Sequence, residues 1–104
     1  MTLGELMNSP IEKLATWYSA QCDGDWEHGH GFKITTIDNP GVAVDIDLCG
    51  TDLELIPYTE KKEDYNSKDN WMICRRTNEK FEGRGAASKL ENIISEFISW
   101  TEKK

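Results

Sequence analysis

The chain has 104 residues, of which 38% are hydrophobic and 30% charged, and this composition indicates one globular domain spanning residues 1–104. Its net charge of −7 repels nucleic-acid phosphates, which excludes DNA and RNA as direct partners. No apolar run approaches the roughly 20 residues of a membrane span, and the N-terminus lacks the basic start of a signal peptide, so we expect a cytoplasmic protein without a membrane partner.

The first predicted element is a helix that begins at Ser9. The run Ser9-Pro10-Ile11-Glu12 combines a capping serine, a proline suited to the first turn and the glutamate of a capping box. Gly24 is expected to end this unit. Apolar residues recur at helical spacing and predict its buried stripe, which consists of Ile11, Leu14, Ala15, Tyr18 and Cys22.

A change to period-two alternation predicts strands after residue 31. A strand over 32–37 and a strand over 42–48 flank the turn signal at 38–41 and should form an antiparallel hairpin, with Asp45 and Asp47 facing away from the apolar side. Residues 53–65 predict a weaker strand, in which Pro57 favours a sheet edge or a bulge. Residues 61–70 are expected to form an exposed loop or a frayed strand end, and two more strands are predicted at 71–76 and around 80–82, where Gly83-Arg84-Gly85 ends the second.

The last predicted element is an amphipathic helix with a capping box at 88–91. Its apolar face comprises Leu90, Ile93, Ile94, Phe97, Ile98 and Trp100. The element order therefore predicts an α+β fold, an antiparallel sheet of four to five strands with the N- and C-terminal helices packed on one face. The other sheet face should be open and carry Asp45, Asp47 and one side of the 71–76 strand.

Negative charge is concentrated in the middle of the chain. Residues 23–60 hold nine acidic residues and one basic residue, Lys33, a distribution that would attract a basic partner. The run Cys22-Asp23-Gly24-Asp25-Trp26-Glu27-His28 sets a tryptophan among carboxylates, in a segment too polar for the core, so we expect Trp26 to be exposed. Exposed tryptophans often contact another molecule, because tryptophan is enriched in binding hot spots. A structural role for Trp26 or Trp71 stays open. The predicted partner-binding residues are Asp23, Asp25, Trp26, Glu27, His28, Asp45, Asp47, Trp71 and Arg75.

Metal and catalytic chemistry receive little support from the residue pattern. A calcium loop counted from Asp23 has His28 where glycine is required and Ile34 where glutamate is required. Cys22, Cys49 and Cys74 form no CxxC pair, which favours reduced thiols, and their acidic surroundings oppose a thiolate. We therefore expect no metal, no cofactor and no catalytic residue. The alternative is a small cysteine-dependent enzyme that uses Cys22 or Cys74.

The chain resembles the immunity protein 53 family of bacterial polymorphic toxin systems. The resemblance rests on Trp17-Tyr18-x-x-Gln21-Cys22-Asp23-Gly24-Asp25-Trp26-Glu27-His28 and, in order, on Asp38-Asn39-Pro40-Gly41, Ile46-Asp47-Leu48-x-Gly50-Thr51-x-Leu53, Trp71-x-x-Cys74-Arg75 and Phe81-Glu82-Gly83-x-Gly85. The chain departs from the family pattern at His30, Val42 and Arg76, where the family has a tyrosine, an aromatic and an apolar residue.

This resemblance implies a cytoplasmic antidote, made beside a toxin gene, that neutralises the toxin by binding it. Charge complementarity predicts a basic toxin, and a basic cleft is typical of a nuclease. Some relatives carry sulfurtransferase-like labels, so the resemblance implies a sulfurtransferase-like activity for the enzymatic alternative. Whether the protein is a monomer or a homodimer stays open.

Overall fold

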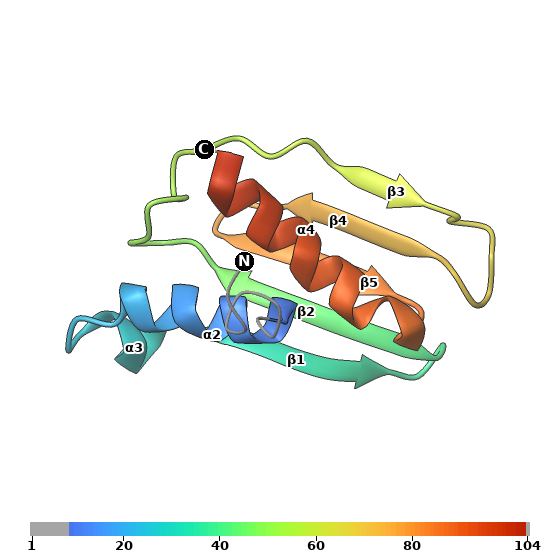
Figure 1. Cartoon of the computed structure of the whole chain (residues 1–104), viewed down its shortest axis with the longest axis horizontal. Helices are drawn as coiled ribbons and strands as arrows, with labels where there is room; N and C mark the ends of the chain where they lie inside the picture. Colours follow the sequence, from blue (N-terminus) through green and yellow to red (C-terminus); the bar gives the residue numbers. More distant parts are fainter. Residues whose placement is uncertain (1–8, 104) are drawn as a thin grey trace, which may run out of the picture.

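The strands form one antiparallel sheet in the order β1-β2-β5-β4-β3 (Figure 1). The structure is a computed structural model and describes residues 9–103. The strands are β1 (Phe32–Ile37), β2 (Gly41–Asp47), β3 (Lys61–Glu63), β4 (Met72–Arg76) and β5 (Lys80–Gly85). The helices are α2 (Pro10–Gln21), the single-turn α3 (Trp26–Gly29), the 3-10 turn η1 (Ala87–Lys89) and α4 (Leu90–Lys103).

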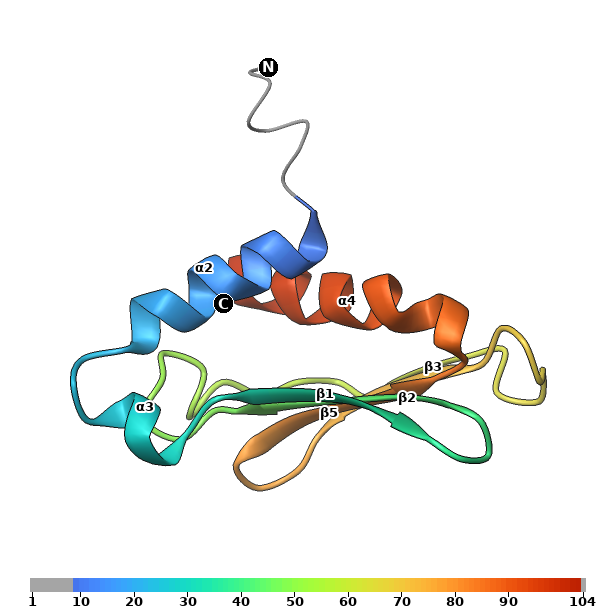
Figure 2. The same cartoon turned by 90° about the horizontal axis from the view of Figure 1, so that it is seen from below.

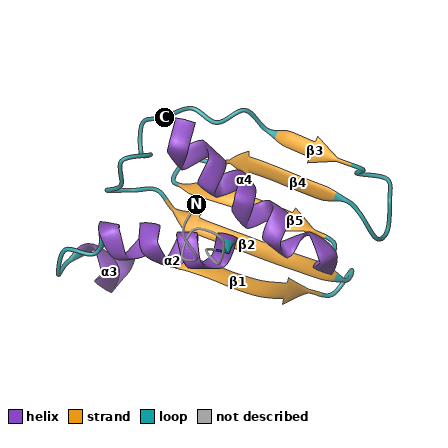
Figure 3. Cartoon of the chain, viewed as in Figure 1, coloured by secondary structure: helices purple, strands orange, loops and turns teal. Residues whose placement is uncertain are grey.

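Both long helices lie over the same sheet face (Figures 2 and 3), while the opposite face is open (Figure 2). The predicted α+β fold with two terminal helices on one face is therefore confirmed. The capping box that begins α2 is present, because the Ser9 hydroxyl accepts from the Glu12 N–H at 3.2 Å and the Glu12 carboxylate accepts from the Ser9 N–H at 3.1 Å. Within residues 9–103, neither helix is long and apolar enough to cross a membrane.

The core lies between α4 and the centre of the sheet. Val44, Ile46, Phe81, Ile93 and Phe97 are fully buried there. A glycine in β5 sets the distance between the layers: a Cβ on Gly83 would come within 2.2 Å of Ile93 Cγ2, so α4 crosses β5 where the strand has no side chain. This close approach explains why β5 continues through Gly85 although the glycines predicted its end at residue 82.

The segment between β2 and β3 differs from the prediction. Residues 53–60 form turns and coil rather than the first part of the predicted 53–65 strand. The strand β3 forms at Lys61–Glu63, inside that predicted strand and in the part where a loop or a frayed strand end was also expected. The guanidinium of Arg76 donates hydrogen bonds to the carbonyls of Leu53, Glu54 and Ile56, and these bonds occupy backbone groups that a strand would pair. A side chain from β4 thus fixes a connection that local sequence alone could not define.

The capping prediction for α4 is also wrong in detail. Ser88 lies in the 3-10 turn η1, and its hydroxyl donates to the carbonyl of Asp69 at 3.1 Å instead of capping the helix. A long-range hydrogen bond has therefore replaced a local one, and α4 begins at Leu90.

The buried stripe of α2 is rotated from the predicted position. Leu14 and Trp17 are its buried residues, whereas Ile11 is 48% exposed and Ala15 is exposed. The reason is that α2 packs against α4 as well as the sheet, and Trp17 lies 4.9 Å from Phe97 of α4 between ring centroids. An apolar flank of α2 consequently stays on the surface.

Candidate functional site

The segment that follows α2 is a tight turn held together by its own carboxylates. Asp23 Oδ1 accepts hydrogen bonds from the N–H of Trp26 at 2.9 Å and of Asp25 at 3.0 Å, and these bonds lower the pKa of Asp23. The Glu27 carboxylate accepts from the N–H of Asp23 and Gly24, each at 3.0 Å. Hydrogen bonds from the backbone of Glu27 itself, Asp23 and Gly24 lower the pKa of Glu27. Both carboxylates therefore organise the turn, while Asp25 is exposed and makes no capping hydrogen bond.

Trp26 is buried, and the prediction that it is exposed is wrong. Its ring is 7% exposed and lies 5.7 Å from the Tyr18 ring and 6.4 Å from the Trp17 ring between centroids. The indole N–H donates to the carbonyl of Cys49 at 2.7 Å, which joins α3 to the loop after β2. The exposed His30 ring stacks on the indole with an interplanar angle of 14°. The apolar ring of Trp26 is packed against other rings, and its N–H has a hydrogen-bond acceptor within the protein. Trp26 therefore supports the surface from below and does not form part of it.

Four of the predicted residues line one hollow beside α3. They are Glu27 and His28 from α3 together with Asp45 and Asp47 from β2. Lys33 and Lys80 line the same hollow and bring positive charge between these carboxylates. An oxygen of Asp47 accepts the Gly31 N–H at 2.9 Å, which ties the start of β1 to β2. The sequence therefore identified the acidic members of this hollow and missed its two lysines.

The open sheet face carries charges of both signs rather than a run of acids. Arg84 donates to Asp45 at 3.0 Å, and Arg75 donates to Glu82 at 3.3 Å, across neighbouring strands. Asp45 and Arg75 do lie on this face as predicted, but β5 inserts between them and supplies their partners. The signal that could have located these partners is the charge alternation Lys80, Glu82, Arg84, which a continuous β5 places on one face.

Trp71 lies at the other end of the sheet, near the β1–β2 turn. It is partly exposed and packs edge-on against Tyr65, whose side chain is 56% exposed, with 6.1 Å between ring centroids. These rings line a hollow that also includes Pro40 and Lys68. Trp71 therefore keeps the accessibility expected of a contact residue, but it is separate from the hollow beside α3.

Acidic side chains gather at the end of the sheet that carries α3. The α2–α3 turn, the loop after β2 and the β4–β5 turn all reach this end (Figure 1). Around Cys49, burial raises the pKa of the thiol, and the carboxylates of Glu54 and Glu79 raise it further. We call this surface the acidic end, and its carboxylates are Asp23, Asp25, Glu27, Asp47, Asp52, Glu54 and Glu79.

The environments of two cysteines oppose the thiolate that a cysteine-dependent enzyme needs. Cys74 is fully buried under α4, and burial raises the pKa of its thiol to about 12. The pKa of Cys49 is raised as well. Cys22 is partly buried at the end of α2 and donates to the carbonyl of Tyr18 at 3.4 Å. No observation on these thiols favours the enzymatic alternative.

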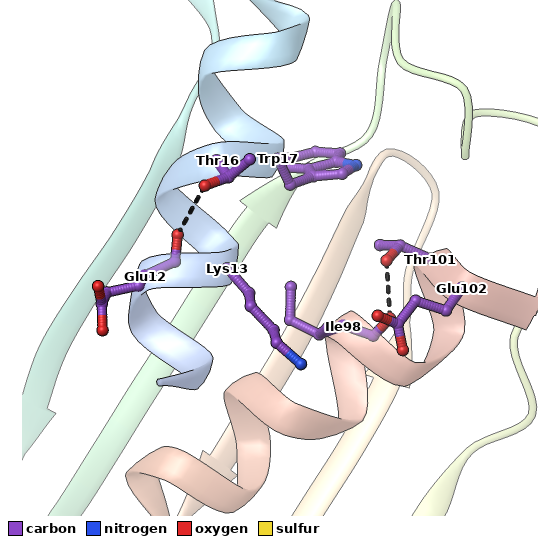
Figure 4. A pocket seen from close by; sticks show the side chains of 7 residues that line it. All are labelled: Glu12, Lys13, Thr16, Trp17, Ile98, Thr101 and Glu102. Carbon is purple, nitrogen blue, oxygen red and sulfur yellow. Dashed lines mark hydrogen bonds between the residues drawn. The ribbon is translucent and has the colours of Figure 1, made fainter. Parts of the chain in front are cut away.

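A further hollow separates α2 from α4 on the helical side of the molecule (Figure 4). Lys13 and Trp17 line it from α2, and Ile98 and Thr101 line it from α4. The Trp17 indole nitrogen is buried without a hydrogen-bond partner among residues 9–103. None of the predicted contact residues borders this hollow.

Comparison with known proteins identifies the family. The family model described as "Immunity protein 53" matches residues 11–102. No curated protein and no solved structure matches the chain. In residues 9–103, no group of three histidine, cysteine or acidic side chains is placed to hold a metal ion. The match covers α2 through α4, including the carboxylate-capped turn and the buried Trp26, and the chain belongs to the immunity protein 53 family.

Proposed function

We propose that this immunity protein neutralises its cognate toxin by binding it stoichiometrically, with the acidic end docked on a basic surface of the toxin. The observation that supports this surface is the convergence of carboxylates from three chain segments beside α3, next to a hollow that Asp45 and His28 also line. An excess of negative charge gathered in this way, in which the carboxylates outnumber Lys33 and Lys80, accelerates the encounter with a partner of the opposite sign.

The carboxylates of the acidic end have different tasks in this proposal. Asp23 and Glu27 are engaged by backbone N–H groups, so they shape the turn and contribute a negative field. Asp25, Glu54 and Glu79 are exposed, and they can form charge-assisted hydrogen bonds with toxin lysine or arginine side chains. Trp26 holds the turn against the loop after β2, which keeps these groups in place for binding.

The docking surface extends from the acidic end over part of the open sheet face. A standard interface covers about 800 Å² of each partner, which is enough to include the hollow beside α3 and the charges of β2 and β5. Asp45, Asp47 and Arg75 then lie within the contact, and Trp71 lies at its margin. Because Arg75 and Asp45 already have partners, a toxin must offer both charge signs to match this part of the surface.

The chemistry of the partner follows from the charge. A toxin domain that binds nucleic acid needs a basic cleft, so a nuclease is the class of toxin that fits an acidic antidote best. Neutralisation in this form takes place in the cytoplasm of the producing cell, where such a toxin would meet its substrate.

The test compares charge reversals at the acidic end and elsewhere on the same molecule. Asp25→Lys with Glu79→Lys alters the acidic end, while Asp38→Lys with Glu91→Lys makes the same change in net charge at exposed positions in the β1–β2 turn and on α4. Binding is measured by surface plasmon resonance against the toxin domain encoded by the neighbouring gene. We expect the first pair to lower the association rate at least about tenfold and the second pair to change it by less than about threefold.

Equal losses of association rate in both double variants would contradict the assigned surface. Loss of neutralisation without loss of binding would contradict stoichiometric inhibition itself. Trp26→Ala does not test the contact, because removing a buried ring destabilises the turn.

A further inference from the structure

The two edges of the sheet differ in how well they are protected. The β3 edge has three residues, Lys61-Lys62-Glu63, and every side chain is charged, which discourages pairing with another strand. The β1 edge has six residues, Phe-Lys-Ile-Thr-Thr-Ile, with Lys33 as its charged side chain and with an uninterrupted register against β2. A six-residue edge strand without acid, proline or bulge is open to strand addition.

The direction of the β1 backbone groups follows from the register. The N–H of Asp47 donates to the carbonyl of Gly31 at 2.9 Å, so this opposed pair is a hydrogen-bonded one. Hydrogen-bonded and non-hydrogen-bonded pairs alternate in an antiparallel ladder. Lys33, Thr35 and Ile37 therefore bond to β2. The N–H and C=O groups of Phe32, Ile34 and Thr36 point away from β2, along the edge.

An apolar flank of α2 adjoins this edge. Ile11 is 48% exposed, Ala15 is exposed and Tyr18 is partly exposed, and these residues recur on one side of the helix. The Tyr18 ring packs edge-on against Phe32 with 5.5 Å between centroids, which places the flank on the β1 side. Figure 1 shows α2 on the β1 side of the helical layer and α4 nearer β4. The flank and the edge thus adjoin at Tyr18 and Phe32.

We propose that a second copy of this chain pairs with the β1 edge, so that two sheets join antiparallel into one. A two-fold axis through the edge at Ile34 pairs Ile34 with Ile34 of the other copy and Phe32 with Thr36 of the other copy. These are the residues whose backbone groups point outward, so every pair can exchange two hydrogen bonds. In this register, each residue of the seam lies opposite a residue whose side chain points to the same face of the sheet. The helices of both copies therefore cover the same face of the joined sheet.

Charge favours a second copy over the toxin at this edge. The β1 strand has no carboxylate and its charged side chain is Lys33, so the attraction of a basic toxin to the hollow beside α3 comes from the carboxylates of α3 and β2 and not from this edge. Antiparallel pairing also places the two acidic ends at opposite ends of the seam, which limits repulsion between chains of net charge −7. Stable interfaces bury about 1,200–2,000 Å², and the flank of α2 provides apolar area beyond the main-chain pairing.

Proline at the two sheet edges supplies a matched test. Thr36→Pro removes an outward N–H from β1 at an exposed position, and Lys62→Pro makes the same change on β3, where Lys61 and Glu63 bond inward to β4. Sedimentation velocity is run from low micromolar to submillimolar protein, with far-ultraviolet circular dichroism to verify folding. We expect a dimer for the unchanged chain and for Lys62→Pro, and a monomer for Thr36→Pro throughout this range.

A second measurement checks the register and does not depend on the proline variant folding. Lys33 of one copy faces Thr35 of the other as a non-hydrogen-bonded pair, with Cα atoms about 4.5 Å apart, which a disulfide can span. Mixing Lys33→Cys with Thr35→Cys under mild oxidation should give a covalent mixed dimer in clear excess over either variant alone.

Three results would overturn the proposal. The first is an unchanged chain that stays monomeric at submillimolar concentration. The second is equal association of Thr36→Pro and Lys62→Pro, and the third is no excess of mixed disulfide. A monomeric chain whose Thr36→Pro variant loses toxin binding would assign the edge to the toxin instead.

Discussion

The indole N–H of Trp26 lies 2.7 Å from the carbonyl oxygen of Cys49, and this hydrogen bond joins the turn after α2 to the loop after β2. Both segments contribute carboxylates to the acidic end, so the contact fixes the relative position of charges that are 25 to 31 residues apart in sequence (Glu27 to Asp52 and Asp23 to Glu54). Gly50 follows directly with a φ of +78°, and a Cβ at this position would approach Trp26 Cδ1 to 3.1 Å. The ring and the glycine form one close-packed junction.

Trp26→Phe should test this junction. The substitution keeps an aromatic ring but leaves the Cys49 carbonyl without its donor, so we expect a loss of about 1–3 kcal/mol in the free energy of unfolding. Urea denaturation followed by circular dichroism measures the change. His30→Ala removes an exposed ring stacked on the same indole and should cost clearly less. Equal costs would mean that stacking, rather than the hydrogen bond, dominates.

The capping carboxylates predict a pH dependence of stability. The pKa values of Asp23 and Glu27 are lower in the folded protein than in the unfolded chain, so the unfolded state binds more protons as the solution is acidified. Their stabilisation is present above the unfolded pKa values, near pH 4 to 5, and is lost as the pH falls through the folded values. Urea unfolding across this acidic range should show a shallower slope for Asp23→Asn with Glu27→Gln. Asp25→Asn, which removes no capping bond, should follow the unchanged protein.

Close packing between α4 and β5 predicts a steric effect at Gly83. Gly83→Ala places a Cβ against Ile93 Cγ2, which forces the helix or the strand to move and should cost about 1–3 kcal/mol. Ile93→Ala makes room for this methyl group, although removing the buried side chain itself lowers the stability of the protein. The double variant should therefore be more stable than the sum of the single costs predicts, and thermal denaturation of all four proteins measures this coupling. Strict additivity would show that the sheet absorbs the extra methyl group elsewhere.

The hydrogen bonds of Arg76 should protect the loop after β2 from hydrogen exchange. Its guanidinium holds the carbonyls of Leu53, Glu54 and Ile56, so Arg76→Leu leaves these acceptors to solvent and should increase amide hydrogen exchange across 53–60. Arg84 provides the control, because its guanidinium pairs with Asp45 on the open face and makes no contact with this loop in the hydrogen bonds described above. Arg84→Leu should leave exchange in 53–60 unchanged.

Thiol reactivity separates the antidote from the enzymatic alternative. Burial raises the pKa of Cys74, and burial with nearby carboxylates raises that of Cys49, so both should react with iodoacetamide far more slowly than free cysteine at neutral pH. Mass spectrometry of native protein locates the label, and unfolded protein provides the reference. Rapid alkylation of Cys74 in the native state would support the cysteine-dependent enzyme.

Elements with local signals were predicted well from the sequence. Ser9 and Glu12 define the start of α2 without outside help, and the alternation from Val42 to Asp47 defines both β2 and its buried face. The errors occur where a group that is distant in sequence determines the local backbone conformation. Ser88 bonds to Asp69 rather than capping α4, and Arg76 organises residues 53–56 into turns.

The candidate site was predicted in part for the same reason. Acidic residues close together in sequence indicated the α2–α3 turn correctly, but the sequence alone does not show that Asp23 and Glu27 bond to the backbone. Trp26 was predicted to be exposed because its sequence neighbours are polar, but the carbonyl and the rings that bury it come from Cys49, Trp17 and Tyr18. The partners of Asp45 and Arg75 were missed because the sequence does not show that β5 lies between β2 and β4, and because its glycines concealed the continuation of this strand through Arg84.

The carboxylates that bond to the backbone and those that are exposed have different roles, and this difference predicts how such antidotes diversify. Replacing Asp23 or Glu27 alters the turn that every other group depends on, so a lineage can change them only by rebuilding its scaffold. Asp25, Glu54 and Glu79 lack this constraint in the backbone bonding described above, and they can be exchanged as toxins drift. Descendants of one ancestral antidote should accordingly keep the first pair and vary the second set.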